Sequence, residues 1–133
     1  MFATLKRYRH VAALAPLMLA MIATASAQAP YPNRNITLVL PFAAGSGTDT
    51  TTRIISKELG TALGVGIVIE NKPGANGSLA ASQVARSAPD GYTLMVSTNT
   101  PHSANPYLMK NMTYDPVKDF TPIARTGDLP FML

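Results

Sequence analysis

The sequence contains no cysteine and no tryptophan, and only 14% of its 133 residues are charged. Without cysteine, the chain cannot form a disulfide scaffold, a thiolate zinc site, a cysteine nucleophile or a lipid-modified cysteine anchor. The low charge does not indicate disorder, because 47% of the residues are hydrophobic. Length alone corresponds to one ordinary domain.

Histidine is also scarce, and the usual catalytic motifs are incomplete. His10 and His102 are too few for a histidine-rich metal site, and no paired carboxylates share a helical spacing. The segment Gly45–Thr50 has two of the three glycines of a dinucleotide fingerprint and no Walker lysine. Ala44 stands where a nucleophile elbow requires glycine. We therefore predict no catalytic residue, no metal and no cofactor.

Most of the net charge of +4 lies at the N-terminus. Three basic residues are followed by an apolar run and a small-x-small site: Lys6, Arg7, Arg9, Val11–Ala23 and Ala25–Ala27. This pattern predicts a secretory signal peptide over residues 1–27. The alternative is a membrane anchor, but a run of 13 residues is shorter than the roughly 20 needed to cross a bilayer. Residues 28–133 carry eight basic and seven acidic residues, which removes the argument for nucleic-acid binding. Export without cysteine fits a bacterial periplasm.

Three short apolar runs predict β-strands at Ile36–Phe42, Val65–Glu70 and Tyr92–Thr98. Each run ends in a loop of glycine or polar residues. The apolar residues are continuous rather than alternating, which is typical of strands buried on both faces of a parallel sheet.

Two helices are expected between these strands. Thr48–Leu63 has helical spacing, with Ile54 and Ile55 on its apolar side. We expect Thr48 to cap this helix and Gly64 to end it. A second helix is expected over Ser78–Ala88, capped by Ser78 and followed by a turn.

The remaining chain is expected to hold a short helix, a turn and two extended segments: Asn105–Lys110, Asp115-Pro116, Thr121–Thr126 and Leu129–Leu133. The alternation of strands and helices predicts an α/β fold with a parallel sheet flanked by helices. Since the chain stops inside an apolar segment, we expect it to be the N-terminal part of a longer protein.

Three loops follow the carboxyl ends of the predicted strands: Ala43–Asp49, Asn71–Ser78 and Thr98–His102. Ligands of open α/β sheets bind at this edge. The first two loops combine glycines with a helix N-terminus, which favours an anion such as a carboxylate or phosphate. Alternatively, the glycines only make turns and the polar residues only cap helices. Three such loops at one edge favour a binding cleft.

Six ordered segments carry a family resemblance: Tyr31-Pro32, Ile36–Phe42, Gly45–Asp49, Glu70–Gly77, Ala88–Leu94 and Tyr114–Phe120. Together they resemble the Bug-type periplasmic solute receptors of tripartite tricarboxylate transporters. The resemblance covers essentially the whole chain after residue 27. It implies a periplasmic-binding-protein type II (Venus flytrap) fold, with residues 28–133 as the N-terminal part of lobe I and the second lobe missing.

The resemblance also implies a function. Such a receptor captures a small carboxylate in the periplasm, either a di- or tricarboxylate, an amino acid or an aromatic acid. It passes this ligand to membrane permease subunits without covalent chemistry, and it is expected to be a monomer at full length. The alternatives are a truncated secreted α/β hydrolase or nucleotide-handling enzyme, and a fragment without activity.

The residues expected to bind the ligand come from the three loops: Phe42, Ala44, Gly45, Ser46, Gly47, Thr48, Asp49, Asn71, Gly74, Gly77, Ser78, Thr98, Asn99 and His102. In similar receptors, main-chain amides and ordered water hold a ligand carboxylate in this place. The chain departs from the family pattern at Ala43-Ala44 and Ser46, where relatives often carry proline or glycine. It also departs at Asn76–Ala80, where a Gly-Gly-Asn-Ile-Gly pattern is common. Because of both departures, the ligand of a relative is a weaker guide to the ligand of this chain.

Overall fold

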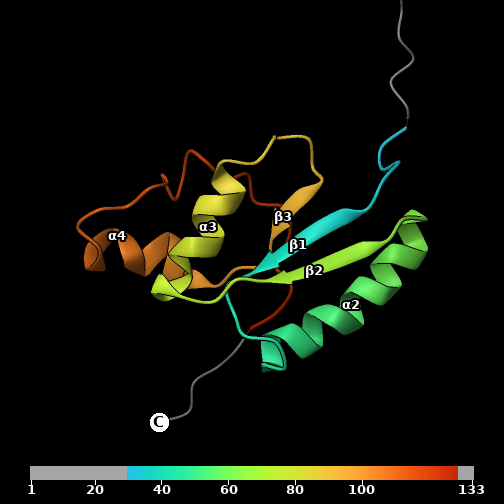
Figure 1. Cartoon of the computed structure of the whole chain (residues 1–133), viewed down its shortest axis with the longest axis horizontal. Coiled ribbons are helices and arrows are strands. Elements are labelled where there is room, and N and C mark those ends of the chain that lie inside the picture. Colours follow the sequence, from blue (N-terminus) through green and yellow to red (C-terminus); the bar gives the residue numbers. More distant parts are fainter. Residues whose placement is uncertain (1–29, 129–133) are drawn as a thin grey trace, which may run out of the picture. The chain divides into compact units, whose positions relative to one another are not determined.

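A parallel sheet forms the centre of the computed structural model, which describes residues 30–128 (Figure 1). Its three strands are β1 (Ile36–Leu40), β2 (Ile67–Asn71) and β3 (Thr93–Met95), in the order β2–β1–β3. The predicted α/β fold with a parallel sheet is confirmed. The first and third strands are shorter than predicted because residues 41–42 and 97–98 lie beyond the ladder, although the Tyr92 carbonyl and the Val96 N–H still bond to β1.

The central strand is the most buried part of the sheet. Ile36, Leu38 and Leu40 are at most 6% exposed, and Val39 on the opposite face is fully buried. Apolar side chains of the two neighbouring strands, including Ile69, pack against the first three. Burial on both faces explains why the sequence of β1 is continuously apolar.

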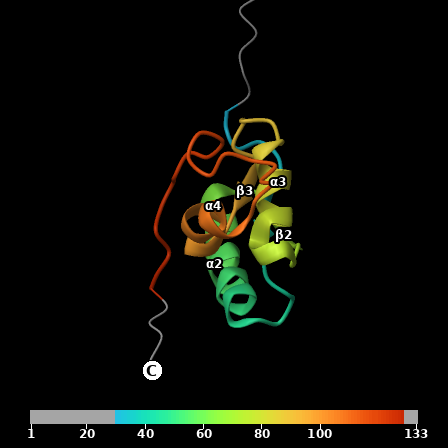
Figure 2. The same ribbon diagram turned by 90° about the vertical axis from the view of Figure 1, so that its left-hand side faces the viewer.

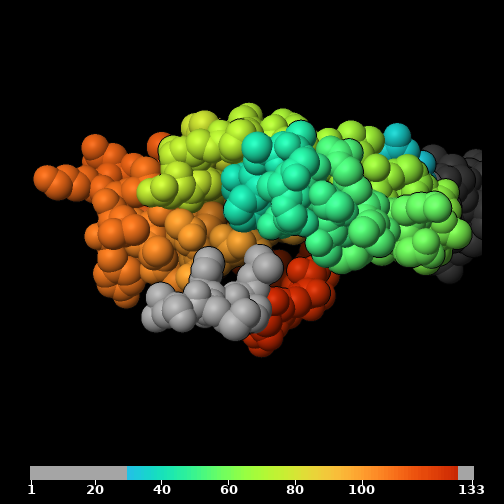
Figure 3. Space-filling model, turned by 90° about the horizontal axis from the view of Figure 1, so that it is seen from below, coloured from blue at the N-terminus to red at the C-terminus, as the bar shows by residue number. Residues whose placement is uncertain are grey.

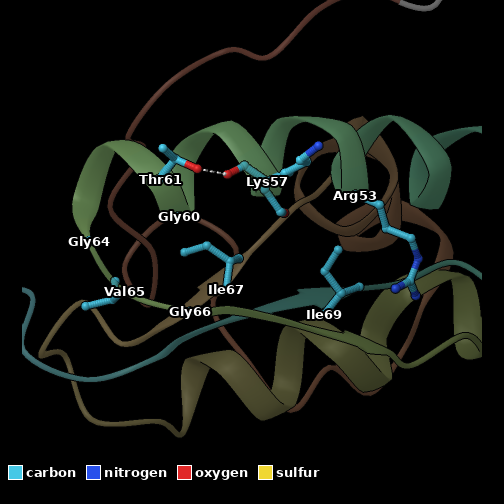
Figure 4. Close-up of a pocket in the computed structure, with 10 residues that line it drawn as sticks. Arg53, Lys57, Gly60, Thr61, Gly64, Val65, Gly66, Ile67 and Ile69 are labelled. Carbon is cyan, nitrogen blue, oxygen red and sulfur yellow. Dashed lines mark hydrogen bonds between the residues drawn. The ribbon is translucent and has the colours of Figure 1, made fainter.

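The two longer helices, α2 (Gly47–Leu63) and α3 (Ser78–Ala85), cover opposite faces of the sheet (Figures 1 and 4). Ile67 and Ile69 of β2 point toward α2 (Figure 4). Glu70 has the opposite orientation and accepts a hydrogen bond of 2.9 Å from Gln83 of α3. These alternating directions follow from the two-residue period of a strand.

The start of α2 differs from the prediction. Ser46, rather than Thr48, is the N-cap, because its hydroxyl accepts the N–H of Asp49 at 3.2 Å. The helix therefore begins one residue before Thr48. Its end is as predicted, with Gly64 in the left-handed conformation at φ 69°.

The face that α2 turns toward the sheet also differs from the prediction. Thr52 and Ser56 are buried, whereas Ile54 is 66% exposed and Ile55 is 41% exposed. A methyl group at Gly60 would lie 3.0 Å from the Val65 carbonyl oxygen and 3.5 Å from Ile67 Cγ1, so this glycine lets the last turns of α2 lie close to the start of β2. Figure 3 shows the cyan-to-green residues of α2 spread over the surface.

The second predicted helix ends earlier and begins differently. It stops at Ala85, three residues before Ala88, and its N-cap is Gly77 rather than Ser78. A single 3-10 turn, η2 (Ala75–Gly77), precedes it. Ser78 does not cap the helix because its hydroxyl contacts Asn105 and Met109 instead.

The last elements are a π-helical segment, η3 (Thr100–Ala104), and α4 (Asn105–Leu108), next to the start of α3 (Figure 2). The predicted turn at Asp115-Pro116 is present, since the N–H of Asp119 donates to the Asp115 carbonyl at 3.2 Å. The extended segment predicted at Thr121–Thr126 forms no strand, because it is exposed and pairs with none of the three strands.

All these elements belong to one compact unit that begins at Pro32. The predicted signal peptide over residues 1–27 and the predicted segment Leu129–Leu133 lie outside the described residues. Within residues 30–128, no helix combines the length and hydropathy needed to cross a membrane.

Candidate functional site

The loops that follow the three strands meet at one edge of the sheet, as predicted. Gly77, at the start of α3, packs between Pro41, which follows β1, and Pro101, which lies beyond β3. A methyl group at Gly77 would lie 3.2 Å from Pro41 Cβ and 2.7 Å from Pro101 Cγ. The arrowheads of β1 and β2 point toward this edge in Figure 1. The carboxyl ends of parallel strands necessarily share one edge, so this convergence follows from the topology.

The β1–α2 loop is held by hydrogen bonds of its own. The N–H of Ser46 donates to the Ala43 carbonyl at 3.2 Å, and the N–H of Thr50 donates to the Ser46 carbonyl at 2.9 Å. The N–H of Gly45 donates to the Asp49 carboxylate at 2.8 Å. The N–H groups of Gly45 and Ser46 are therefore committed within the protein.

Two donors at the helix start remain. Among the described residues, the backbone N–H groups of Gly47 and Thr48 have no acceptor. They are the first two residues of a helix of 17 residues. The first N–H groups of a helix lack partners inside the helix and carry a partial positive charge, which suits an anion. Of the predicted loop residues, Gly47 and Thr48 thus offer the groups that fit a carboxylate.

Asp49 is buried and fully engaged by the protein. Its side chain accepts hydrogen bonds from Arg53 Nε at 2.9 Å, from the Gly45 N–H at 2.8 Å and from Asn71 Nδ2 at 2.9 Å. These bonds, in that order of importance, hold the pKa of the Asp49 carboxyl well below its ordinary value. Asp49 lies in the first turn of α2, and its oxygens face protein donors.

Asn71 links the ends of β1 and β2. Its amide nitrogen donates to the Phe42 carbonyl at 3.1 Å as well as to Asp49, and its amide oxygen accepts from Arg53 at 3.2 Å. Asp49, Arg53 and Asn71 thus form a closed ring of hydrogen bonds, called the Asp49 ring below. The sequence pattern did not single out Arg53, although its spacing of four residues from Asp49 on a helix is typical of an ion pair.

Ser78 and His102 are also occupied by contacts within the protein. The Ser78 hydroxyl accepts a hydrogen bond of 2.9 Å from the fully buried Asn105, which also donates to the Asn76 carbonyl at 3.0 Å. His102 packs edge-on against Phe120, with ring centres 4.8 Å apart, and its Nδ1 lies 3.3 Å from the Pro116 carbonyl. No sequence pattern indicated Asn105, because its partners Asn76 and Ser78 lie far from it along the chain.

The other predicted residues lie at the same edge with fewer contacts. Ala44 and Asn99 are exposed and Thr98 is half-buried. The Gly74 carbonyl accepts the N–H of Gly77 at 2.9 Å. None of these positions accepts a hydrogen bond from the N–H groups of Gly47 and Thr48.

A separate groove of about 650 Å³ runs between α2 and β2 (Figure 4). Arg53, Lys57, Ile67 and Ile69 are among the residues that line it. None of the predicted ligand residues lies there, so this groove is distinct from the loop edge. Within residues 30–128, no cluster of three or more acidic or histidine side chains could hold a metal ion.

Comparison with known proteins identifies relatives of the chain. Residues 51–133 match the family described as the tripartite tricarboxylate transporter family receptor. A UPF0065 protein of Bordetella bronchiseptica is 38% identical over 90% of this chain, and the protein BugT of Bordetella pertussis is 36% identical over 84%. Each alignment covers 36% of the relative, so the chain spans about a third of the length of these proteins.

Solved structures agree with this assignment. The protein MatC of Rhodopseudomonas palustris, solved with bound malate, is 49% identical with a TM-score of 0.65, over 69% of this chain and 31% of that one. A second R. palustris protein, solved with adipate, is 40% identical with a TM-score of 0.62, over 65% and 29% of the two chains. The periplasmic binding protein BugD is 38% identical with a TM-score of 0.58, over 70% and 31%.

These relatives are binding proteins rather than enzymes, so the hydrolase and nucleotide-enzyme alternatives are set aside. The family resemblance found in the six sequence segments is confirmed. The chain belongs to the tripartite tricarboxylate transporter receptor family.

Proposed function

We propose that this chain is the N-terminal part of a periplasmic receptor that captures a small carboxylate for a tripartite transporter. The observation that carries the proposal is the pair of free N–H groups of Gly47 and Thr48 at the start of α2. A carboxylate that accepts both would place its charge at the positive end of the helix dipole.

The bound ligands of two relatives support this ligand class. MatC was solved with malate, and a second R. palustris protein was solved with adipate. Both ligands carry two carboxylates, of which one suits the α2 N-terminus. Thr98 and Asn99, which follow β3 at the same edge of the sheet, are proposed to contact the remainder of such a ligand.

Export to the periplasm is part of the proposal. Basic residues, an apolar run and a small-x-small site over residues 1–27 are the features of a cleavable signal peptide. The matched relatives include periplasmic binding proteins, which supports the same compartment. The membrane permease subunits of the transporter are the proposed partners.

Calorimetric titration of the full-length receptor that contains this chain against malate, adipate and ATP tests the ligand class. We expect heat of binding with one or both dicarboxylates and none with ATP. The variants Gly47→Pro and Gly47→Ala then test the site. Proline fits the first position of a helix, and Ser46 already has the extended backbone, at ψ 161°, that precedes proline. Gly47→Pro therefore removes one N–H while leaving the helix in place.

We expect Gly47→Pro to weaken dicarboxylate binding about tenfold, the effect of losing one charge-assisted hydrogen bond. Gly47→Ala keeps the N–H, and no atom lies within 4 Å of its added methyl group, so it serves as the matched control. Equal affinities of the two variants would contradict the site. Tight ATP binding without carboxylate binding would contradict the function.

A further inference from the structure

We propose that Asp49 is a positioning residue of the carboxylate site, which sets the shape and charge of the β1–α2 loop and does not touch the ligand. The inference rests on the proposed function and deepens it. It assigns ligand contact to the Gly47 and Thr48 amides and assigns their placement to the Asp49 ring of Asp49, Arg53 and Asn71.

The burial of Asp49 argues against direct contact with an anion. The residue is 2% exposed, and both of its carboxylate oxygens accept hydrogen bonds from protein donors. A ligand carboxylate that met Asp49 directly would bring two negative charges together at short distance, which is unfavourable. Asp49 is therefore suited to hold the loop rather than the ligand.

The hydrogen bonds of Asp49 decide which loop amides remain free. Its carboxylate takes the N–H of Gly45, and its own N–H is taken by the Ser46 hydroxyl at 3.2 Å. Between these two fastened points lie Gly47 and Thr48, whose N–H groups have no acceptor in the described part of the chain. This arrangement resembles a capping box whose acidic residue reaches one residue further back than usual.

Arg53 makes the site electrically suitable for an anion. Its guanidinium lies 2.9 Å from the Asp49 carboxylate and cancels that negative charge. Without Arg53, an uncompensated carboxylate would stand in the first turn of α2, where it would oppose a second anion. Asn71 fastens the same pair to the end of β2, 22 residues away in the sequence.

Four variants, made in the full-length receptor that contains this chain, test this inference by titration with malate. They are Asp49→Asn, Arg53→Gln, the double variant of both, and Lys57→Gln. Lys57 lies one turn beyond Arg53 and lines the same groove, so its variant removes a positive charge from that helix face without touching the Asp49 ring. Each titration is made at about 10 mM and about 300 mM salt, where charge–charge effects differ strongly. Circular dichroism confirms that each variant is folded.

We expect Asp49→Asn to weaken malate binding at least about tenfold at both salt concentrations. The loss comes from a changed loop geometry, and salt screens charges but does not restore a geometry. Arg53→Gln should weaken it about tenfold at low salt and only about threefold at high salt, because the uncompensated carboxylate of Asp49 repels the ligand. The double variant should bind about as weakly as Asp49→Asn at both salt concentrations, because it lacks both the carboxylate that holds the loop and the charge that repels the ligand. Lys57→Gln should change the affinity less than about twofold.

The outcomes separate this inference from the proposed function. If the wild type binds no dicarboxylate, the proposed function is wrong and the positioning role is wrong with it. If the wild type binds malate and Asp49→Asn binds it equally well, only the positioning role is overturned. A salt-independent loss in Arg53→Gln would overturn the charge compensation, since damage to packing alone does not respond to salt.

Discussion

At the scale of single residues, several polar side chains predicted to face a ligand serve the protein itself. Asp49, Asn71 and Ser78 are engaged by hydrogen bonds to other parts of the chain, and His102 packs on an aromatic ring. Buried polar atoms need partners, because an unpaired one costs about 1–3 kcal/mol. Residue type and loop position do not reveal whether such a partner is a ligand or a distant residue.

The low pKa of Asp49 predicts how stability responds to acid. In the unfolded chain this carboxyl takes up a proton near pH 4, whereas hydrogen bonds from Arg53, Gly45 and Asn71 keep it ionised in the folded protein to lower pH. Its contribution to stability is therefore complete above about pH 4 and is lost as the pH falls below that value. Urea unfolding at pH 7, 4 and 3 should show a smaller acid-induced loss in Asp49→Asn than in the wild type.

Asp115 supplies a comparison for this acid response. Backbone N–H groups of Lys118 and Val117 also lower the pKa of its carboxyl, but it lies outside the Asp49 ring. Asp115→Asn should likewise reduce the acid-induced loss of stability while leaving malate binding unchanged. An identical acid response in Asp49→Asn and the wild type would contradict the hydrogen bonding described for Asp49.

At the scale of elements, the ends of the helices depend on contacts that the spacing of hydrophobic residues does not reveal. The spacing predicted α2 and its end at Gly64, because a glycine after the last apolar residue is a local signal. The predicted N-cap and the predicted buried face of α2 were wrong. The Ser46 hydroxyl accepts the N–H of Asp49, and small residues of α2 lie against β2. Ile54 and Ile55, in the middle of α2, are accordingly exposed.

The start of α3 offers a test of how tightly the loops meet. Gly77 has φ 82°, a conformation that favours glycine, and it packs against Pro41 and Pro101. Gly77→Ala should lower the free energy of unfolding by about 2–4 kcal/mol, from backbone strain and overpacking together. Gly64→Ala, at φ 69° with no atom within 4 Å, should cost about 1–2 kcal/mol from strain alone.

Urea unfolding of both glycine variants measures the difference between them. A larger loss at Gly77 than at Gly64 reports the close packing of the three loops at the sheet edge. Equal losses would mean that the three loops do not meet as closely as the structure places them.

At the scale of the whole molecule, the sheet leaves two outer edges. In the β1–β2 ladder, the Ile36 N–H donates to the Gly66 carbonyl and the Lys72 N–H donates to the Leu40 carbonyl. The backbone N–H and C=O groups of the even-numbered residues of β2 therefore point toward β1, and those of the odd-numbered residues point outward. Within the described residues, no further strand pairs with β2.

Amide hydrogen exchange along β2 tests this topology. The N–H groups of Val68 and Glu70 should exchange at least about a hundredfold more slowly than those of Ile67 and Ile69, because only the first pair lies in the ladder. Protection at Ile67 and Ile69 as well would mean that another strand covers the outer edge of β2.

The sequence by itself determined the family, the α/β alternation and the gathering of the three loops at one edge. These features follow from local information, because apolar runs mark strands, glycines mark turns, and parallel strands bring their carboxyl ends together. Only the tertiary structure decided which loop donors stay free for an anion. The hydrogen bonds that commit the others include contacts between Asp49 and Asn71, which are distant in sequence and close in space.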